Sequence, residues 1–279
     1  LSIFRGIKKV PPGHYVRFRL GSTPETVPYF SWDPASSEIL PTQKNYEAVV
    51  AKTEKLLVDS LAGRLMSDVP LGFFLSGGVD STVTAALVRK HFGIPINTYT
   101  IAFEGDPESE HEVSAKTAKA IGSRHVTRTL ALAELESVSA GFIGRMDEPN
   151  GDRSCVPTYL LCQHARTEVT VALGGDGGDE LFAGYDPFRA LRLAEIYRKA
   201  VPRPLHHALR LLAARLPVSH KNISLDFKIK RTLRGLDHPP RLWNPVWLGA
   251  LEPSDLARLT GSRFSIEEIY SEAIEAWES

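Results

Sequence analysis

Short apolar segments alternate with longer helical patterns through the middle of this 279-residue chain, and this alternation constrains the fold most strongly. Four segments have the apolar, β-branched or aromatic composition of buried strands, at 71–75, 97–103, 125–130 and 168–173. Helical patterns precede or separate them, at 45–67, 81–91, 110–121, 133–145 and from 158 onward. Strands that alternate with helices in this way indicate parallel βαβ units. The sequence therefore predicts an α/β fold with a doubly wound parallel sheet.

The two ends of the chain have different patterns. Residues 1–40 contain short β-type runs between prolines, which predicts strands and turns. After Tyr185 the β pattern stops, and residues 190–216 predict a long helix interrupted at Pro202 and Pro204. The remaining residues are expected to be helical, with tryptophan anchors at Trp243, Trp247 and Trp277. We therefore expect three parts: a short N-terminal β segment over 1–40, an α/β part over 41–185 and a helical extension over 186–279.

Charge and composition narrow the function classes. The 33 Lys and Arg residues balance 33 Asp and Glu residues, so bulk charge does not indicate a nucleic-acid-binding protein. The longest apolar run is shorter than the roughly 18 residues that a membrane-spanning helix needs, and the first residues lack a long apolar signal region. Cys155 and Cys162 lack the spacing of a zinc site. We expect a cytoplasmic protein that does not span a membrane.

The first glycine cluster, Ser76-Gly77-Gly78-Val79-Asp80-Ser81, stands between an apolar segment and a helical pattern. Backbone N–H groups at a helix N-terminus, approached through glycines, form an anion site suited to phosphate, and the Ser76 and Ser81 hydroxyls can add hydrogen bonds. The lysine of a Walker A loop and the preceding glycine of a nucleophile elbow are both missing. Asp80 indicates either a plain helix cap or a metal ligand that bridges to phosphate oxygens.

The second glycine cluster, Gly174-Gly175-Asp176-Gly177-Gly178-Asp179-Glu180, directly follows the segment 168–173. It does not match a dinucleotide-binding loop, because Glu180 stands where the third glycine belongs, and its ligand spacing does not match an EF-hand. Ligands bind at the carboxyl ends of parallel strands, where these carboxylates can meet Asp80 and form a Mg²⁺ site between two loops. A solvated acidic turn is the alternative.

Residues 76–81 resemble the SGGxDS pyrophosphate-binding loop (PP-loop) of the ATP pyrophosphatase superfamily. Together with the block from Gly174 to Tyr185, about 100 residues later, they resemble the synthetase domain of glutamine-hydrolysing asparagine synthetases. Arg5-Gly6-Ile7 and Pro11-Pro12-Gly13-His14 resemble the end of that family's glutaminase domain. The resemblance implies a parallel sheet of the five-stranded type, with the end of the glutaminase domain and a connector over 1–40, the ATP-binding synthetase domain over 41–185 and its helical continuation over 186–279.

The resemblance also implies a two-step ligation. ATP and aspartate would give a β-aspartyl adenylate and pyrophosphate, and ammonia, released from glutamine by a glutaminase domain, would displace AMP to give asparagine. Asp176 stands where a relative has a Glu that faces the acyl-adenylate, and Arg153 matches a phosphate-binding arginine, which implies catalytic roles for both. The implied binding residues are Leu75 and Ile101 for adenine, Ser76, Gly77, Gly78, Asp80 and Ser81 for the phosphates, Gly174 and Gly175 for the nucleotide, and Asp80 and Asp179 for Mg²⁺.

Two features of the family are not found in this sequence. The chain starts at Leu1, without the catalytic N-terminal cysteine, and it contains no (R/V)xPFLD segment with the lysine that follows it. We therefore expect this polypeptide alone to bind ATP but to be impaired as a synthetase. Two alternatives stay open: a related amidotransferase or β-lactam synthetase that adenylates another carboxylate, and a non-catalytic ATP-binding module. We also leave open whether the chain forms a homodimer.

Residues 186–235 are locally basic, with twelve Lys or Arg residues against three acidic residues. Such a segment can be an RNA-binding face or a solvated helix surface. The cysteine patterns of tRNA-thiolating relatives are missing, and aromatic residues suited to base stacking are few in this segment. We therefore expect small-molecule substrates and no nucleic-acid partner.

Overall fold

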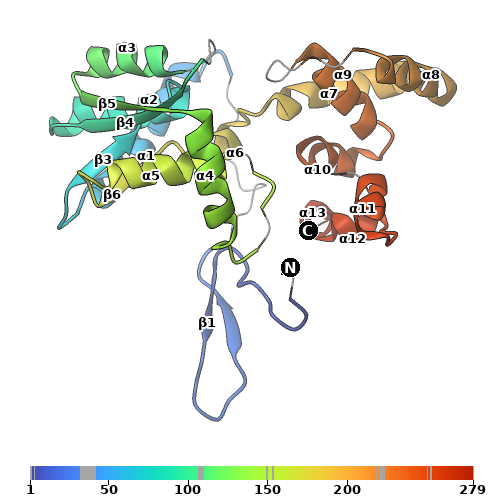
Figure 1. Cartoon of the computed structure of the whole chain (residues 1–279), viewed down its shortest axis with the longest axis horizontal. Helices are drawn as coiled ribbons and strands as arrows, with labels where there is room; N and C mark the ends of the chain where they lie inside the picture. Colours follow the sequence, from blue (N-terminus) through green and yellow to red (C-terminus); the bar gives the residue numbers. More distant parts are fainter. Residues whose placement is uncertain are drawn as a thin grey trace. The chain divides into compact units, whose positions relative to one another are not determined.

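A computed structural model describes residues 2, 4–31, 42–105, 110–148, 150–152, 154–217, 219, 224–249, 251 and 253–278 (Figure 1). The chain divides into two compact units, Leu1–Gly175 and Asp176–Ser279. The boundary between the units falls inside the second glycine cluster. Among the described helices, none combines the length and apolar character required to cross a membrane.

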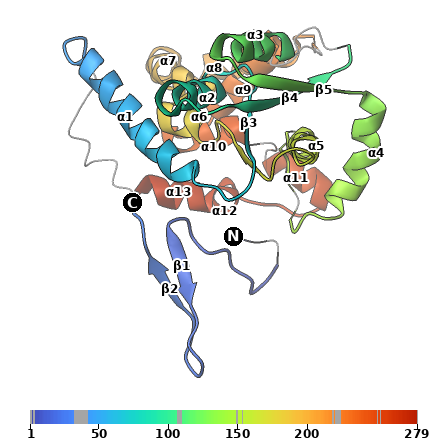
Figure 2. The same cartoon turned by 90° about the vertical axis from the view of Figure 1, so that its left-hand side faces the viewer.

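The first unit is built on a parallel sheet with the strand order β5-β4-β3-β6 (Figure 1); β5, β4 and β3 are also labelled in Figure 2. Its strands are β3 (Leu71–Phe74), β4 (Asn97–Phe103), β5 (Arg124–Leu130) and β6 (Val171–Leu173). Phe73 of β3 pairs with Thr98 of β4 on one side and with Leu173 of β6 on the other. The predicted fold class is confirmed. The described sheet has four strands because the sequence offers four buried β-type segments, whereas the resemblance implies the five-stranded type.

Successive strand residues point to opposite faces of a sheet, and here both faces carry apolar side chains. Helices therefore cover both faces. Phe73 packs in a cluster with Leu61 and Val88, whereas its neighbour Phe74 packs with Tyr99 in a second cluster. α2 begins at Val79 rather than at the expected Ser81, because Gly78 has extended backbone and caps the helix. The helices of this unit are α1 (Tyr46–Arg64), α2 (Val79–Phe92), α3 (His111–Ile121), α4 (Leu132–Ile143) and α5 (Cys155–Ala165).

A two-stranded antiparallel sheet precedes the parallel sheet in the chain. It consists of β1 (His14–Arg17) and β2 (Glu25–Pro28), with His14 opposite Pro28. The proline-punctuated β pattern of the N-terminal segment therefore correctly predicted strands. Several of its large side chains are exposed, including Phe18 at 75%.

The regular secondary structure described in the second unit is all helical. The expected interruption occurs at Pro202, between α7 and α8. The interruption expected at Pro204 is wrong, because Pro204 lies in the first turn of α8, where its missing N–H costs no intrahelical hydrogen bond. Trp243 and Trp247 stack on each other in its core, as expected of anchors. The prediction for Trp277 is wrong: its side chain is 66% exposed, because α13 buries the neighbouring Ala273 and Ile274 more deeply. The helices are α6 (Gly178–Phe182), α7 (Asp186–Ala200), α8 (Arg203–Ala214), α9 (Leu225–Gly235), the 3₁₀ helix η2 (Pro240–Leu242), α10 (Trp243–Leu248), α11 (Pro253–Thr260), α12 (Ile266–Ile269) and α13 (Ser271–Glu278).

Candidate nucleotide site

The loop between β3 and α2 is held in shape by its own hydroxyl groups. Ser81 Oγ accepts a hydrogen bond from the Ser76 N–H at 3.2 Å and lies 3.0 Å from Ser76 Oγ. Ser76 Oγ in turn accepts the Gly78 N–H at 3.2 Å. The two serines therefore support the loop itself, and a bound anion would meet mainly backbone N–H groups.

The first turn of α2 supplies such groups. Val79, Asp80 and Ser81 open the helix, and N–H groups in a first turn have no carbonyl partner within the helix. Within the described residues, their N–H groups make no other hydrogen bond. The positive end of the helix dipole lies at the same place, so this loop can hold a phosphate group.

Position 77 must be glycine for two reasons. Its φ is +81°, a conformation that side-chain-bearing residues rarely adopt. An added Cβ would also lie 3.1 Å from Cβ of Val113 and 3.3 Å from the Glu110 carbonyl oxygen. The N-terminal end of α3 therefore lies directly against the loop and limits its conformation.

Strand β4 fixes the start of the loop. The Leu75 N–H donates to the Tyr99 carbonyl oxygen at 3.0 Å, and the Thr100 hydroxyl donates to the Leu75 carbonyl oxygen. The sequence reasoning missed Thr100, although a threonine inside a buried strand is a signal for such a contact. Leu75 directly follows β3 and its side chain is 1% exposed, whereas Ile101 lies two residues before the end of β4 and is half-buried. The adenine contacts expected of both residues stay a prediction.

The two glycine clusters meet at Gly175. A Cβ on Gly175 would lie 2.6 Å from the Ser81 backbone nitrogen and 2.9 Å from Cβ of Asp80. This approach is closer than any side chain permits, so residue 175 must be glycine for α2 to start where it does. The strand order explains the meeting, because β6 lies beside β3 and Gly174 and Gly175 follow β6. Gly174 is half-buried.

The carboxylates of the second cluster have different surroundings. The Tyr185 hydroxyl donates to Glu180 Oε1 at 2.6 Å and lowers the pKa of that carboxyl group. Asp179 stands in the first turn of α6, and its carboxylate lies where a side chain on Gly184 would be. The side chains of Asp176 and Asp179 form no hydrogen bond or ion pair with any described residue, and Asp176 is exposed.

Two predicted residues are not brought together by these observations. Asp80 belongs to the first unit and Asp179 to the second, so a shared Mg²⁺ stays a prediction. Arg153 lies outside the described residues. Among its described neighbours, the Ser154 N–H donates to Asp152 Oδ1 at 2.8 Å. In the described part of the chain, no group of three or more His, Cys, Asp or Glu side chains is arranged to hold a metal.

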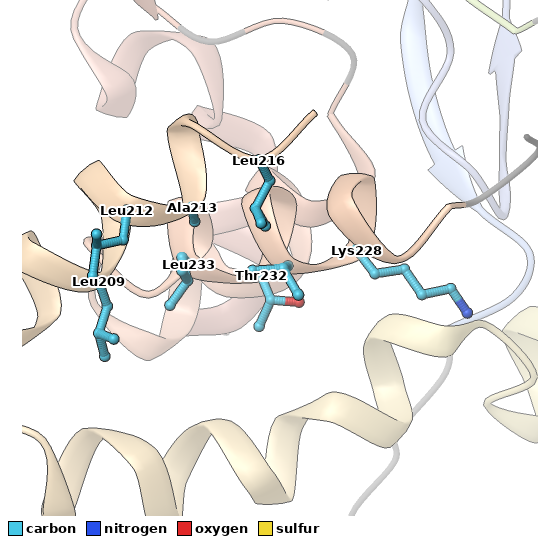
Figure 3. A pocket seen from close by; sticks show the side chains of 8 residues that line it. Leu209, Leu212, Ala213, Leu216, Lys228, Thr232 and Leu233 are labelled. Carbon is cyan, nitrogen blue, oxygen red and sulfur yellow. The ribbon is translucent and has the colours of Figure 1, made fainter. Parts of the chain in front are cut away.

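A separate groove in the second unit does not suit a nucleotide. It has a volume of about 500 Å³ and is lined mainly by aliphatic side chains of α8 and α9 (Figure 3). Lys228 Nζ, the ammonium group at its edge, pairs with Asp186 at 2.8 Å. Phosphate oxygens would lose hydration in this groove and gain few donors, because most of its lining is aliphatic.

Comparison with known proteins agrees with the two-cluster pattern. The asparagine synthase family profile matches residues 52–269. Putative glutamine-hydrolysing asparagine synthetases of Mycobacterium bovis and Mycobacterium tuberculosis are 33% identical over 236 residues, 83% of this chain and 35% of theirs. Asparagine synthetase 1 of Bacillus subtilis is 31% identical over 78% of this chain and 34% of its own length. A protein of Penicillium rubens named amidase chyE is 29% identical over 70% of this chain and 31% of its own length. The chain thus spans about a third of the length of these relatives.

Proposed function

The chain belongs to the asparagine synthase family, and on that premise we propose that it contains the ATP-dependent part of an amide-forming ligase. In this proposal the carboxylate of aspartate attacks the α-phosphorus of ATP, a β-aspartyl adenylate forms and pyrophosphate leaves. Ammonia then attacks the acyl carbon, AMP leaves and asparagine results. Ammonia would come from glutamine through a glutaminase domain, as the names of the relatives suggest.

The first step needs the departing pyrophosphate to be held while negative charge develops on it. We assign this role to the backbone of the loop 76–81, whose N–H groups at the start of α2 have no partner among the described residues. Gly175 supports the same loop, because its backbone lies against Asp80 and Ser81. Leu75, directly after β3, and Ile101, near the end of the neighbouring strand β4, would lie beside the adenine.

Asp80 and Asp179 suit Mg²⁺, which prefers oxygen ligands and typically uses one or two carboxylates together with substrate phosphates. Neither carboxylate is engaged by another described residue, and the missing side chain at Gly184 leaves room for that of Asp179. When bound, the ion would neutralise charge on the phosphates. Asp80 and Asp179 would hold it, and Glu180 would not, because its carboxylate already accepts the Tyr185 hydroxyl.

We propose that Asp176 and Arg153 act in the reaction itself. The exposed Asp176 carboxylate follows Gly175 directly, so it would lie beside the nucleotide-binding loop and face the acyl-adenylate. Arg153 would bind a phosphate through charge-assisted hydrogen bonds.

The observation that carries the proposal is the contact of Gly175 with Asp80 and Ser81, which joins two motifs about 100 residues apart at one strand-end loop. Titration calorimetry of the chain with ATP and Mg²⁺ tests the site. We expect saturable binding that weakens about tenfold in Asp80→Ala and in Asp179→Ala, because each loses a charged contact. Glu180→Gln is the matched control and should leave the affinity within about twofold. Unchanged affinity in both aspartate variants would refute the metal assignment.

The second candidate function is adenylation of a carboxylate other than that of aspartate. The similarity to a fungal protein named an amidase favours it. Exchange of labelled pyrophosphate into ATP separates the candidates, because exchange requires a carboxylate that the enzyme adenylates. Aspartate and a panel of other carboxylic acids should be compared with this chain and with any longer natural form. Exchange with another acid, and none with aspartate, would replace aspartate in the proposal.

A further inference from the structure

A second cavity, with a polar lining, lies entirely within the helical unit and uses none of the residues assigned above. It has a volume of about 530 Å³, within the range of small-molecule sites. It is bounded by the end of α7, the start of α8 and the turn after α9. Its polar lining includes Tyr197, Arg198, Arg203, His206 and Asp237.

The one carboxylate in this lining is already neutralised. Asp237 Oδ1 lies 2.8 Å from His206 Nε2, and Asp237 Oδ2 pairs with Arg210. His206 is 7% exposed, and its other ring nitrogen lies 3.1 Å from the Tyr197 hydroxyl. This chain of contacts, centred on the buried His206, forms one wall of the cavity and offsets the negative charge that would repel an anion.

Two arginines in the lining are available to a ligand. Neither Arg198 nor Arg203 forms an ion pair with any residue in the described ranges. The Arg198 guanidinium stacks over the Trp243 ring at 5.7 Å, which orders the side chain without consuming its charge. Arg203 is the first residue of the twelve-residue helix α8, so its N–H group is unpaired within the helix and lies at the positive end of the dipole.

We propose that this cavity binds a phosphate-bearing anion between the guanidinium groups of Arg198 and Arg203 at the N-terminal end of α8. Guanidinium groups match the geometry of phosphate oxygens and bind them with paired hydrogen bonds. The cavity is also large enough for a nucleoside monophosphate, whose phosphate group would bind to the same two arginines. The site is independent of the proposed ligase activity.

Imidazole NMR of the whole chain tests the proposal, because His206 lies in the cavity wall. Inorganic phosphate, titrated at constant ionic strength, should shift the His206 ring signals saturably. Arg198→Gln/Arg203→Gln should weaken this binding at least about tenfold. Arg215→Gln, at the other end of α8, is the matched control and should stay within about twofold, since exposed charges at a distance contribute little. Ser76→Ala in the first unit should leave the His206 titration unchanged.

A His206 shift that never saturates, or one weakened equally by Arg215→Gln and by the double variant, would overturn the proposal. If the double variant does not fold, Arg203→Gln alone provides the test, because its guanidinium pairs with no described residue. Titration with AMP then distinguishes the source of the phosphate. Tighter binding of AMP than of inorganic phosphate supports a nucleotide ligand, and equal binding supports the free anion.

Discussion

The two glycine clusters each contain a position that must be glycine, but for different reasons. Gly77 is required mainly by its own φ of +81°, within a loop whose hydrogen bonds join residues at most five positions apart. Gly175 is required by Asp80 and Ser81, which lie almost a hundred positions earlier in the chain. A glycine motif can thus encode a local conformation or a distant contact, and the sequence pattern looks similar in both cases.

Gly175→Ala should have the largest effect, because its methyl group would collide with backbone atoms that cannot move separately from α2. We expect a loss of about 2–3 kcal/mol of unfolding free energy, as for overpacking, together with weaker ATP binding. Urea unfolding and calorimetry measure the two effects. Gly63→Ala, whose methyl group meets nothing within 4 Å, is the control. Equal stability of the two variants would contradict the close contact.

Gly77→Ala should cost somewhat less, about 1–2 kcal/mol, from its positive φ and its contact with Val113. Gly93→Ala separates these causes, because Gly93 has a φ of +64° and open space around it. We expect Gly93→Ala to lower the unfolding free energy only by the conformational cost of a positive φ. In a Val113→Ala background, the extra cost of Gly77→Ala should shrink toward that of Gly93→Ala. An unchanged extra cost would show that the Val113 contact is unimportant.

Gly184→Ala should change stability by less than about 1 kcal/mol, because the nearest obstacle is the end of the Asp179 side chain, which can rotate. Its effect should appear instead in Mg²⁺-dependent ATP affinity, since the displaced carboxylate is the proposed ligand. Gly141→Ala, with open space around its methyl group inside α4, should leave the affinity unchanged and raise stability slightly through helix propensity. A stability loss without any change in affinity would separate Asp179 from the metal.

The smallest effect concerns a link between the segment before β6, which leads into the second cluster, and strands β4 and β5. Glu168, just before β6, accepts the Tyr99 hydroxyl of β4 at 2.9 Å and pairs with Arg124. Arg124 and Tyr99 lower the pKa of Glu168 from 4.5 to about 2, so this link stabilises the folded state above pH 4.5 and is lost as the pH falls toward 2.

The difference in unfolding free energy between the natural chain and Glu168→Gln should therefore be constant above pH 4.5 and vanish near pH 2. Urea unfolding at a series of pH values measures it. ATP affinity at neutral pH should not change, because Glu168 lies before β6 and the loop follows β3. A pH-independent difference would mean that Glu168 acts through packing rather than charge.

Residues whose environment is set by near neighbours were predictable. The boundaries of β4 follow directly from its β-branched and aromatic run, and the break before α8 follows from Pro202. Trp277 was predicted wrongly, because its size indicates burial but the orientation of α13 leaves it exposed. Thr100 was missed, since its hydroxyl partner, the Leu75 carbonyl oxygen, belongs to the adjacent strand.

The sequence by itself determined the alternation of strands and helices and the family to which the chain belongs. It also determined the glycine loop after β3, which resembles a pyrophosphate-binding loop. These properties depend on residue periodicity and on motifs read within a few residues. Only the tertiary structure decided that Gly175 lies against Asp80 and Ser81, and that Arg198 and Arg203 line one cavity. The physical reason is that such contacts depend on which strands become neighbours in the sheet and how helices pack, and no local pattern carries that information.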